Sequence, residues 1–265
     1  MNLMDLPYFL VGIISGIASG LFGIGGGMII VPTMLFLGIS SHQAVAISVV
    51  QMIFAAIFGS YINHKKKNLN FKDGIYIGLG GLLGASFSGT LVSLLSDIAL
   101  TAIFLCVSFA FFLKYAFGVK NTTNHTQRSK FAKNAILFGA GVFTGVFAIS
   151  LGIGGGLLIA PILAYFLGYD NKKVVPISLF FVVFASLAGL FSFINADIIT
   201  YELAQKGVIV GVASMIGVFV GIKIMEKMRL SSHFKILLVV YALSIAMTTY
   251  SLLNKLGLIS QFTKG

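Results

Sequence analysis

Two long apolar runs of this chain are interrupted by the same pentapeptide. The sequence Gly-Ile-Gly-Gly-Gly occupies 23–27 inside the run 7–38, and it returns at 152–156 inside the run 135–168. A glycine cluster exposes backbone N–H groups, and in hydrocarbon such backbone is tolerated only where it is buried in protein or lines a polar cavity. Two interruptions of this kind, at corresponding places in two similar halves, are typical of a transporter built from internal repeats.

The rest of the chain has the composition of a membrane protein. It is 58% hydrophobic and only 9% charged, whereas a soluble domain carries about 25% charged residues. Its net charge of +11 comes from lysines and arginines that collect in short loops, where such residues set the orientation of membrane helices. The charge therefore does not indicate nucleic-acid binding. Beside the two interrupted runs, six apolar runs approach the roughly 20 residues that span a bilayer; they are 44–62, 74–95, 98–117, 171–194, 203–222 and 234–253. The sequence therefore predicts an all-α polytopic membrane protein.

The sequence shows no set of residues that would indicate an enzyme. There is no paired carboxylate, no Ser/His/Asp set and no histidine cluster, so no catalytic residue, metal site or cofactor is predicted. The single cysteine, Cys106, excludes an intrachain disulfide. We expect it to be a small buried hydrophobic residue.

The two halves of the chain repeat each other. Residues 15–38 match 144–167 at eight positions with an offset of 129. After one inserted residue, the segment 44–48 aligns with 174–178. Further glycines also align, and their spacing predicts close helix–helix contacts; they are Gly74, Gly78 and Gly84 in the first half and Gly207, Gly211 and Gly217 in the second. The predicted domains are a first transmembrane repeat 1–118, a basic cytoplasmic linker 119–134 and a second transmembrane repeat 135–265.

Loop charges bear on how the halves are oriented. As one helix, the run 7–38 would be roughly 48 Å long, against a hydrocarbon core of about 30 Å. If each interrupted run crosses once, the halves are parallel and the two sides hold 11 and 6 basic residues. If each interrupted run enters and leaves on one face, the halves are inverted and the counts become 14 and 3. The positive-inside rule favours inverted repeats, each with a glycine-broken (re-entrant or discontinuous) helix plus three transmembrane helices, and with both termini outside.

A candidate binding site follows from the glycine clusters. A helix is expected to begin after each cluster, and the first N–H groups of a helix lack partners and carry partial positive charge. Small anions bind such groups, so the predicted substrate-binding glycines are Gly25, Gly26, Gly27, Gly154, Gly155 and Gly156. The alternative is that these glycines only let helices cross closely.

Three polar residues in the following helices extend this candidate site. Ser48 and Ser178 occupy equivalent positions and either donate to the same ligand or bond their own helix backbone. Gln51 lies one turn beyond Ser48, and its counterpart is Phe181, so any role of the glutamine is asymmetric.

The duplicated glycine motif, the proline five residues after it and the segment 42–48 (His-Gln-Ala-Val-Ala-Ile-Ser) resemble the TauE/SafE family of membrane anion exporters. The resemblance covers nearly the whole chain. It implies a bacterial inner-membrane permease for sulfite, organosulfonates or related sulfur oxyanions. It also implies that the two glycine clusters form the substrate region, with Ser48 and Ser178 beside it.

We therefore expect a multi-pass inner-membrane exporter of a small anion, sulfite or a related sulfur oxyanion, that works by alternating access at a midplane site. Two alternatives stay open: a channel-like or uptake permease for another anion such as thiosulfate or a carboxylate, and a membrane assembly factor without flux. The expected partners are the small anion and the lipid bilayer, with a homodimer as an open alternative and no nucleic acid.

Overall fold

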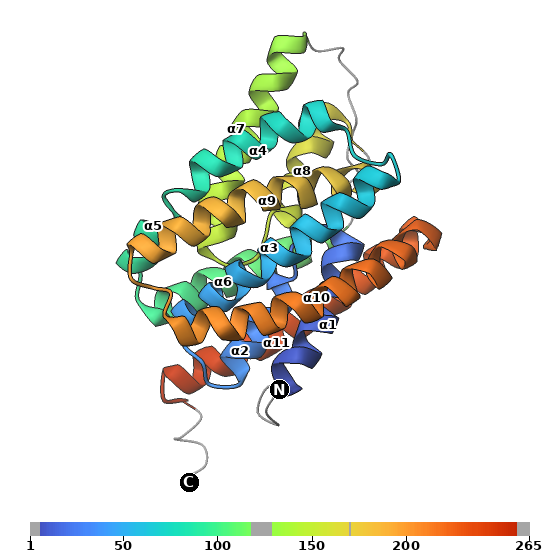
Figure 1. Cartoon of the computed structure of the whole chain (residues 1–265). Helices are drawn as coiled ribbons and strands as arrows, with labels where there is room; N and C mark the ends of the chain where they lie inside the picture. The colour runs from blue at the N-terminus through green and yellow to red at the C-terminus, as the bar shows by residue number, and fades with distance from the viewer. Residues whose placement is uncertain (1–5, 118–128, 170, 259–265) are drawn as a thin grey trace.

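The computed structural model describes residues 6–117, 129–169 and 171–258, which form helices and contain no strand (Figure 1). The helices are α1 (Leu6–Phe22), α2 (Gly27–Phe36), α3 (Ser41–Lys65), α4 (Phe71–Ala85), α5 (Ser88–Leu94), α6 (Asp97–Ala116), α7 (Lys130–Ser150), α8 (Gly156–Leu167), α9 (Asn171–Asn195), α10 (Tyr201–Lys227) and α11 (Leu230–Lys255).

Seven helical stretches in the described part of the chain are long and apolar enough to cross a membrane, with α4 and α5 counted as one. Six of them coincide with the apolar runs of spanning length, and the seventh is α7. The prediction of an all-α polytopic protein is confirmed. Large apolar side chains lie exposed on the outer faces of these helices, as lipid contact requires. Cys106 is also exposed on α6, so the expectation that it is buried was wrong.

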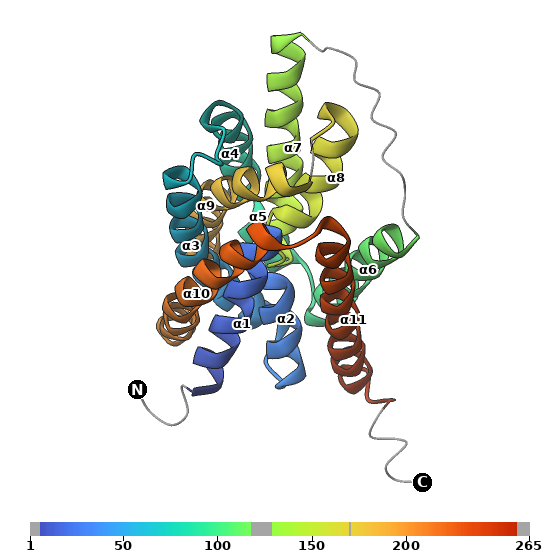
Figure 2. The same ribbon diagram turned by 90° about the vertical axis from the view of Figure 1, so that its right-hand side faces the viewer.

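Each glycine-containing run folds into two helices joined at the pentapeptide. The first run forms α1 and α2, and the second forms α7 and α8. Figure 2 shows α1 and α7 approaching the middle of the molecule from opposite ends, while α2 and α8 leave it again toward those same ends. The two glycine segments therefore meet in the interior.

The helices pack in reciprocal pairs between the halves: α1 lies against α10, and α7 lies against α4. A Cβ built at Gly16 of α1 would lie 2.2 Å from the Ser214 carbonyl oxygen, and one built at Gly145 of α7 would lie 2.7 Å from the Gly81 carbonyl oxygen. These positions correspond under the repeat offsets of the sequence. Such short approaches need glycine, because any side chain would push the helices apart.

The glycines of α4 and α10 were predicted to make close helix–helix contacts, and this is confirmed. A Cβ at Gly84 would lie 2.1 Å from the Val142 carbonyl oxygen, and a Cβ at Gly217 would lie 2.1 Å from that of Ile13. Both contacts join one half of the chain to the other.

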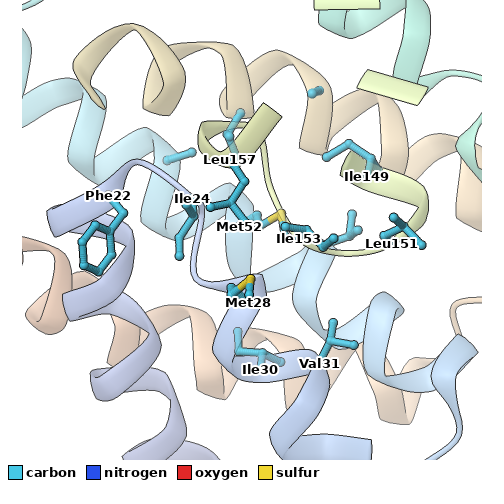
Figure 3. Packing of buried hydrophobic residues seen from close by; sticks show 14 of the residues in the cluster. Phe22, Ile24, Met28, Ile30, Val31, Met52, Ile149, Leu151, Ile153 and Leu157 are labelled. Atoms are coloured by element: carbon cyan, nitrogen blue, oxygen red, sulfur yellow. The ribbon is translucent and has the colours of Figure 1, made fainter. Parts of the chain in front are cut away.

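The hydrophobic core surrounds the place where the two glycine segments meet. Ile24 and Met28 from the first segment, Ile153 and Leu157 from the second, and Met52 of α3 are all buried in one cluster. Figure 3 shows these side chains between the two connecting segments. Both segments are thereby excluded from lipid.

Residues 119–128 of the predicted linker lie outside the described residues. Its last part is helical, because α7 begins at Lys130 and not near 135. The Ser129 side chain accepts a hydrogen bond from the Ala132 N–H, and this cap starts the helix earlier than the apolar pattern indicates.

Candidate functional site

The backbone between α1 and α2 adopts conformations that favour glycine. The φ angles are +70° at Gly23, +69° at Gly25 and +89° at Gly26. In the second segment, Gly152 and Gly154 have φ angles of +64° and +83°. Side chains of L-residues rarely adopt this left-handed region. The repeated pentapeptide is therefore needed by the chain path itself.

The two segments touch backbone to backbone. A Cβ at Gly27 would lie 1.6 Å from the Gly152 carbonyl oxygen, and one at Gly154 would lie 1.8 Å from the Ile24 carbonyl oxygen. At Gly156 the nearest atom is the Gly23 carbonyl oxygen, 2.6 Å away. The close-crossing alternative of the sequence analysis is thus present in the fold, and it does not exclude a site there.

The same segments carry backbone donors without protein partners. All residues from 21 to 28 and from 151 to 157 are buried. No described residue accepts a hydrogen bond from the N–H of Gly25, Gly26, Gly27, Gly155 or Gly156, although Gly154 N–H reaches the Ala148 carbonyl at 3.4 Å. Buried N–H groups are nearly always paired. Unpaired groups that cluster at two helix N-termini are suited to an anionic ligand.

The two predicted serines hold the segments in place and do so reciprocally. Ser48 Oγ donates to the Gly152 carbonyl at 2.8 Å, and Ser178 Oγ donates to the Gly23 carbonyl at 2.8 Å. Each serine thus donates to the first glycine of the pentapeptide in the other half. These bonds differ from the expected alternative of a bond to the serine's own helix, because the halves cross and bring the opposite carbonyl closer.

The place where the two glycine segments, 23–27 and 152–156, touch is called the crossing below. Replacing either serine by alanine should therefore destabilise the crossing. A buried carbonyl that loses its donor costs about 1–3 kcal/mol, and the pseudo-equivalent geometry predicts similar losses for Ser48→Ala and Ser178→Ala. Thermal unfolding of the purified variants would measure them. Ser93→Ala provides the control, because the exposed Ser93 hydroxyl bonds only the Thr90 carbonyl of its own helix. Equal stability of all three variants would contradict this role.

The third predicted polar residue, Gln51, is fully buried at 0% exposure. No described residue pairs with either its Nε2 or its Oε1. A Cβ at Gly26 would lie 3.0 Å from Nε2 and 3.1 Å from Oε1, so the amide lies directly against the start of α2. A buried amide without partners is costly. This amide lies beside the unpaired backbone donors and adds the two N–H donors of its NH2 group and one carbonyl oxygen acceptor.

In the second half of the chain, the ring of Phe181 occupies the position that the Gln51 amide occupies in the first half. A Cβ at Gly155 would lie 2.4 Å from the Phe181 ring, and Gly155 and Phe181 are the repeat counterparts of Gly26 and Gln51. The geometry is therefore shared by the halves while the chemistry differs. A ligand held here meets a polar wall on one side and an apolar wall on the other.

Two side-chain hydroxyls, on the helices that precede the glycine segments, are buried without a partner in the described residues, as the Gln51 amide is. Ser19 of α1 and Thr144 of α7 are both fully buried, and no described residue pairs with either side-chain oxygen. Both precede the glycine segments in the chain. They are additional polar groups near the crossing.

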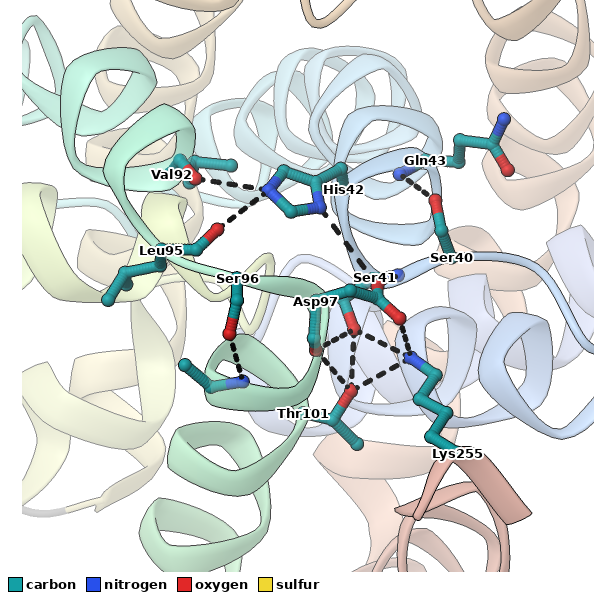
Figure 4. A network of polar contacts seen from close by, with 11 residues as sticks. Ser40, Ser41, His42, Gln43, Val92, Leu95, Ser96, Asp97, Thr101 and Lys255 are labelled. Carbon is teal, nitrogen blue, oxygen red and sulfur yellow. Dashed lines mark hydrogen bonds and ion pairs between the residues drawn. The ribbon is translucent and has the colours of Figure 1, made fainter. Parts of the chain in front are cut away.

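A polar network ties three helices together at the end of the molecule where α3 begins (Figure 4). Asp97 at the start of α6 accepts from the Ser41 N–H and lies 2.7 Å from Lys255 Nζ at the end of α11. His42 Nε2 lies 3.0 Å from the Leu95 carbonyl oxygen. The network fixes the loop after α2 to the frame of the molecule.

A second charged cluster, at the loop after α3, was not found from the sequence. Asp73 is 3% exposed; its Oδ1 lies 2.7 Å from Lys133 Nζ, and its Oδ2 accepts from Asn70 and from the Tyr169 hydroxyl. Burial, and then the hydrogen bond to Asp73, raises the pKa of Tyr169. Asn70 also caps the start of α4, where its side chain accepts from the Asp73 N–H. Nothing local in the sequence points from Asp73 to Lys133, 60 positions later.

Comparison with known proteins finds related sequences that cover most of the chain. The family model described as sulfite exporter TauE/SafE matches residues 8–249. A Methanocaldococcus jannaschii protein named probable membrane transporter protein MJ0441 is 33% identical over 253 residues, which cover 89% of this chain and 92% of that protein. A probable membrane transporter protein of Haemophilus influenzae is 27% identical over 70% of this chain and 72% of its own length. No solved structure matches significantly.

Proposed function

Since this chain belongs to the sulfite exporter TauE/SafE family and is a multi-pass membrane transporter, we propose that its cargo is a small oxyanion. Sulfite, or a related sulfur oxyanion or organosulfonate, is the cargo that the family description favours. The proposed location is the inner membrane, and the proposed direction is export.

One observation carries the proposal of an anion: unpaired, uncharged donors are buried at the crossing. The N–H groups at the starts of α2 and α8 and the Gln51 amide have no partner in the described part of the chain. The atoms nearest to the glycines belong to uncharged residues. Neutral donors can hold an oxyanion without the strong attraction of a buried cation, so the anion can also leave.

The proposed mechanism uses the relation between the halves. We infer inverted repeats because α1 and α7 enter from opposite ends (Figure 2) and because glycine contacts of one half recur in the other at the repeat offsets. The two half-helices α2 and α8 then present their N-termini to one midplane site from opposite sides.

Transport in this scheme requires the crossing to open on one side at a time. The contact between Gly27 and the Gly152 carbonyl closes the direct passage between the segments. A shift of α8 away from α2 would expose the donors toward one face, and the converse shift would expose them toward the other. The Ser48 and Ser178 hydrogen bonds hold the closed arrangement between these shifts.

The direct test is flux into liposomes that contain only the purified protein. Labelled sulfite, thiosulfate, a small sulfonate, sulfate and a carboxylate would be compared under one imposed gradient. Selective flux of sulfite or the sulfonate is the expected result. Selective flux of thiosulfate or the carboxylate would reject the proposed cargo, and absence of flux for all five from folded protein would reject the transport of these anions.

A further inference from the structure

A cavity of about 620 Å³ is lined by both polar and apolar residues. Its walls come from the loop between α3 and α4, the start of α4, the end of α8 with the loop after it, and the first turns of α9. The lining includes Lys67, Asp73, Leu167, Lys173 and Ile177. Nothing in the proposed binding site accounts for this cavity.

The charges of the described residues that line the cavity do not cancel. Asp73 is neutralised by Lys133 at 2.7 Å and is further covered by Asn70 and Tyr169. Lys67 and Lys173 are exposed, and no carboxylate of the described residues lies within ion-pair distance of either ammonium. Among the described residues, two lysines without an ion-pair partner therefore line the cavity, and a concave surface with excess positive charge concentrates anions.

The inner wall of the cavity adjoins the glycine crossing. Ile177 lines the cavity and is 3% exposed, and the next residue, Ser178, donates to the Gly23 carbonyl. The outer wall includes Leu167 and Gly168 at the end of α8, the half-helix that begins with the second glycine cluster. A movement of α8 thus changes the cavity and the crossing together.

We infer that this cavity is the vestibule through which the oxyanion approaches the crossing, and that Lys67 and Lys173 concentrate the anion there. This inference rests on the proposed transport function. Asp73 would repel an anion, and its ion pair with Lys133 removes that repulsion. The same cluster anchors the loop after α8 to α4 and α7, so the vestibule keeps its shape when no anion is bound.

The test neutralises the two lysines and measures both transport and local potential. In Lys67→Gln/Lys173→Gln, the KM for anion flux at low salt should rise about fivefold with kcat unchanged, because steering changes encounter and not the crossing itself. High salt should remove most of the difference from wild type. Lys72→Gln is the matched control, since Lys72 is exposed in the first turn of α4, directly after the loop that carries Lys67, and does not line the cavity.

A second readout does not depend on transport. In a Cys106→Ser background, the Leu167→Cys variant would be labelled with an anionic and a cationic methanethiosulfonate of similar size. The ratio of anionic to cationic labelling rates should fall about tenfold in the double lysine variant and stay unchanged in Lys72→Gln. An unchanged ratio in the double variant overturns the vestibule, whether or not the protein transports. A changed ratio in protein without flux supports the anion-attracting cavity and rejects the transport function.

Discussion

Gln51→Leu should lower anion flux while leaving the protein equally or more stable. The amide is fully buried, without a partner in the described residues, and lies against Gly26. A hydrogen bond to a charged ligand contributes roughly 1.5–3 kcal/mol, so its loss should reduce transport about 10- to 100-fold at limiting anion concentration. Removing an unpaired buried amide should also raise the free energy of unfolding by about 1 kcal/mol.

This opposite movement of flux and stability is what separates a ligand-binding residue from a packing residue. Both quantities would be measured on the same preparation, by flux into liposomes and by thermal unfolding in detergent. Gln43→Leu is the control, because Gln43 lies on the same helix and is exposed; it should change neither quantity. A Gln51→Leu variant that transports normally would remove this amide from the site.

Gly27→Ala should disrupt the crossing of the two glycine segments. Gly27 does not have a positive φ angle, so alanine is compatible with its backbone and the effect is steric alone. The added Cβ would lie 1.6 Å from the Gly152 carbonyl oxygen and 2.6 Å from the Met52 methyl carbon. Because the first of these neighbours is backbone, the segments must separate, and we expect a loss of about 3 kcal/mol or more in stability together with loss of flux.

The matched control is Gly139→Ala. Gly139 lies inside α7, is exposed, and has no atom within 4 Å of a built Cβ. The same substitution there should be neutral or should stabilise the helix by about 0.5–1 kcal/mol, because alanine has the higher helix propensity. Equal thermal stability of the two variants would show that the segments tolerate separation, and close contact would then not be needed.

The sequence by itself determined the membrane helices, the duplication and the position of the glycine segments. These features depend on local properties: the hydrophobic length of a run, the conformational freedom of glycine and the matching of residues 15–38 to 144–167. Each is a property of adjacent residues, so it can be recognised without knowing which helices touch. Of the nine predicted site residues, six are the glycines of the two segments, and the other three, Ser48, Gln51 and Ser178, lie beside the segments on α3 and α9.

The partners of those residues were decided only by the tertiary structure. Ser48 and Ser178 bond carbonyls 104 and 155 positions away, and a serine in a membrane helix would otherwise bond its own backbone. Asp73, Lys133 and Tyr169 come from three segments that are far apart in the sequence, and only the fold brings them into one cluster. Burial then makes each polar group require a partner, and only the packing of the two halves decides which group supplies it.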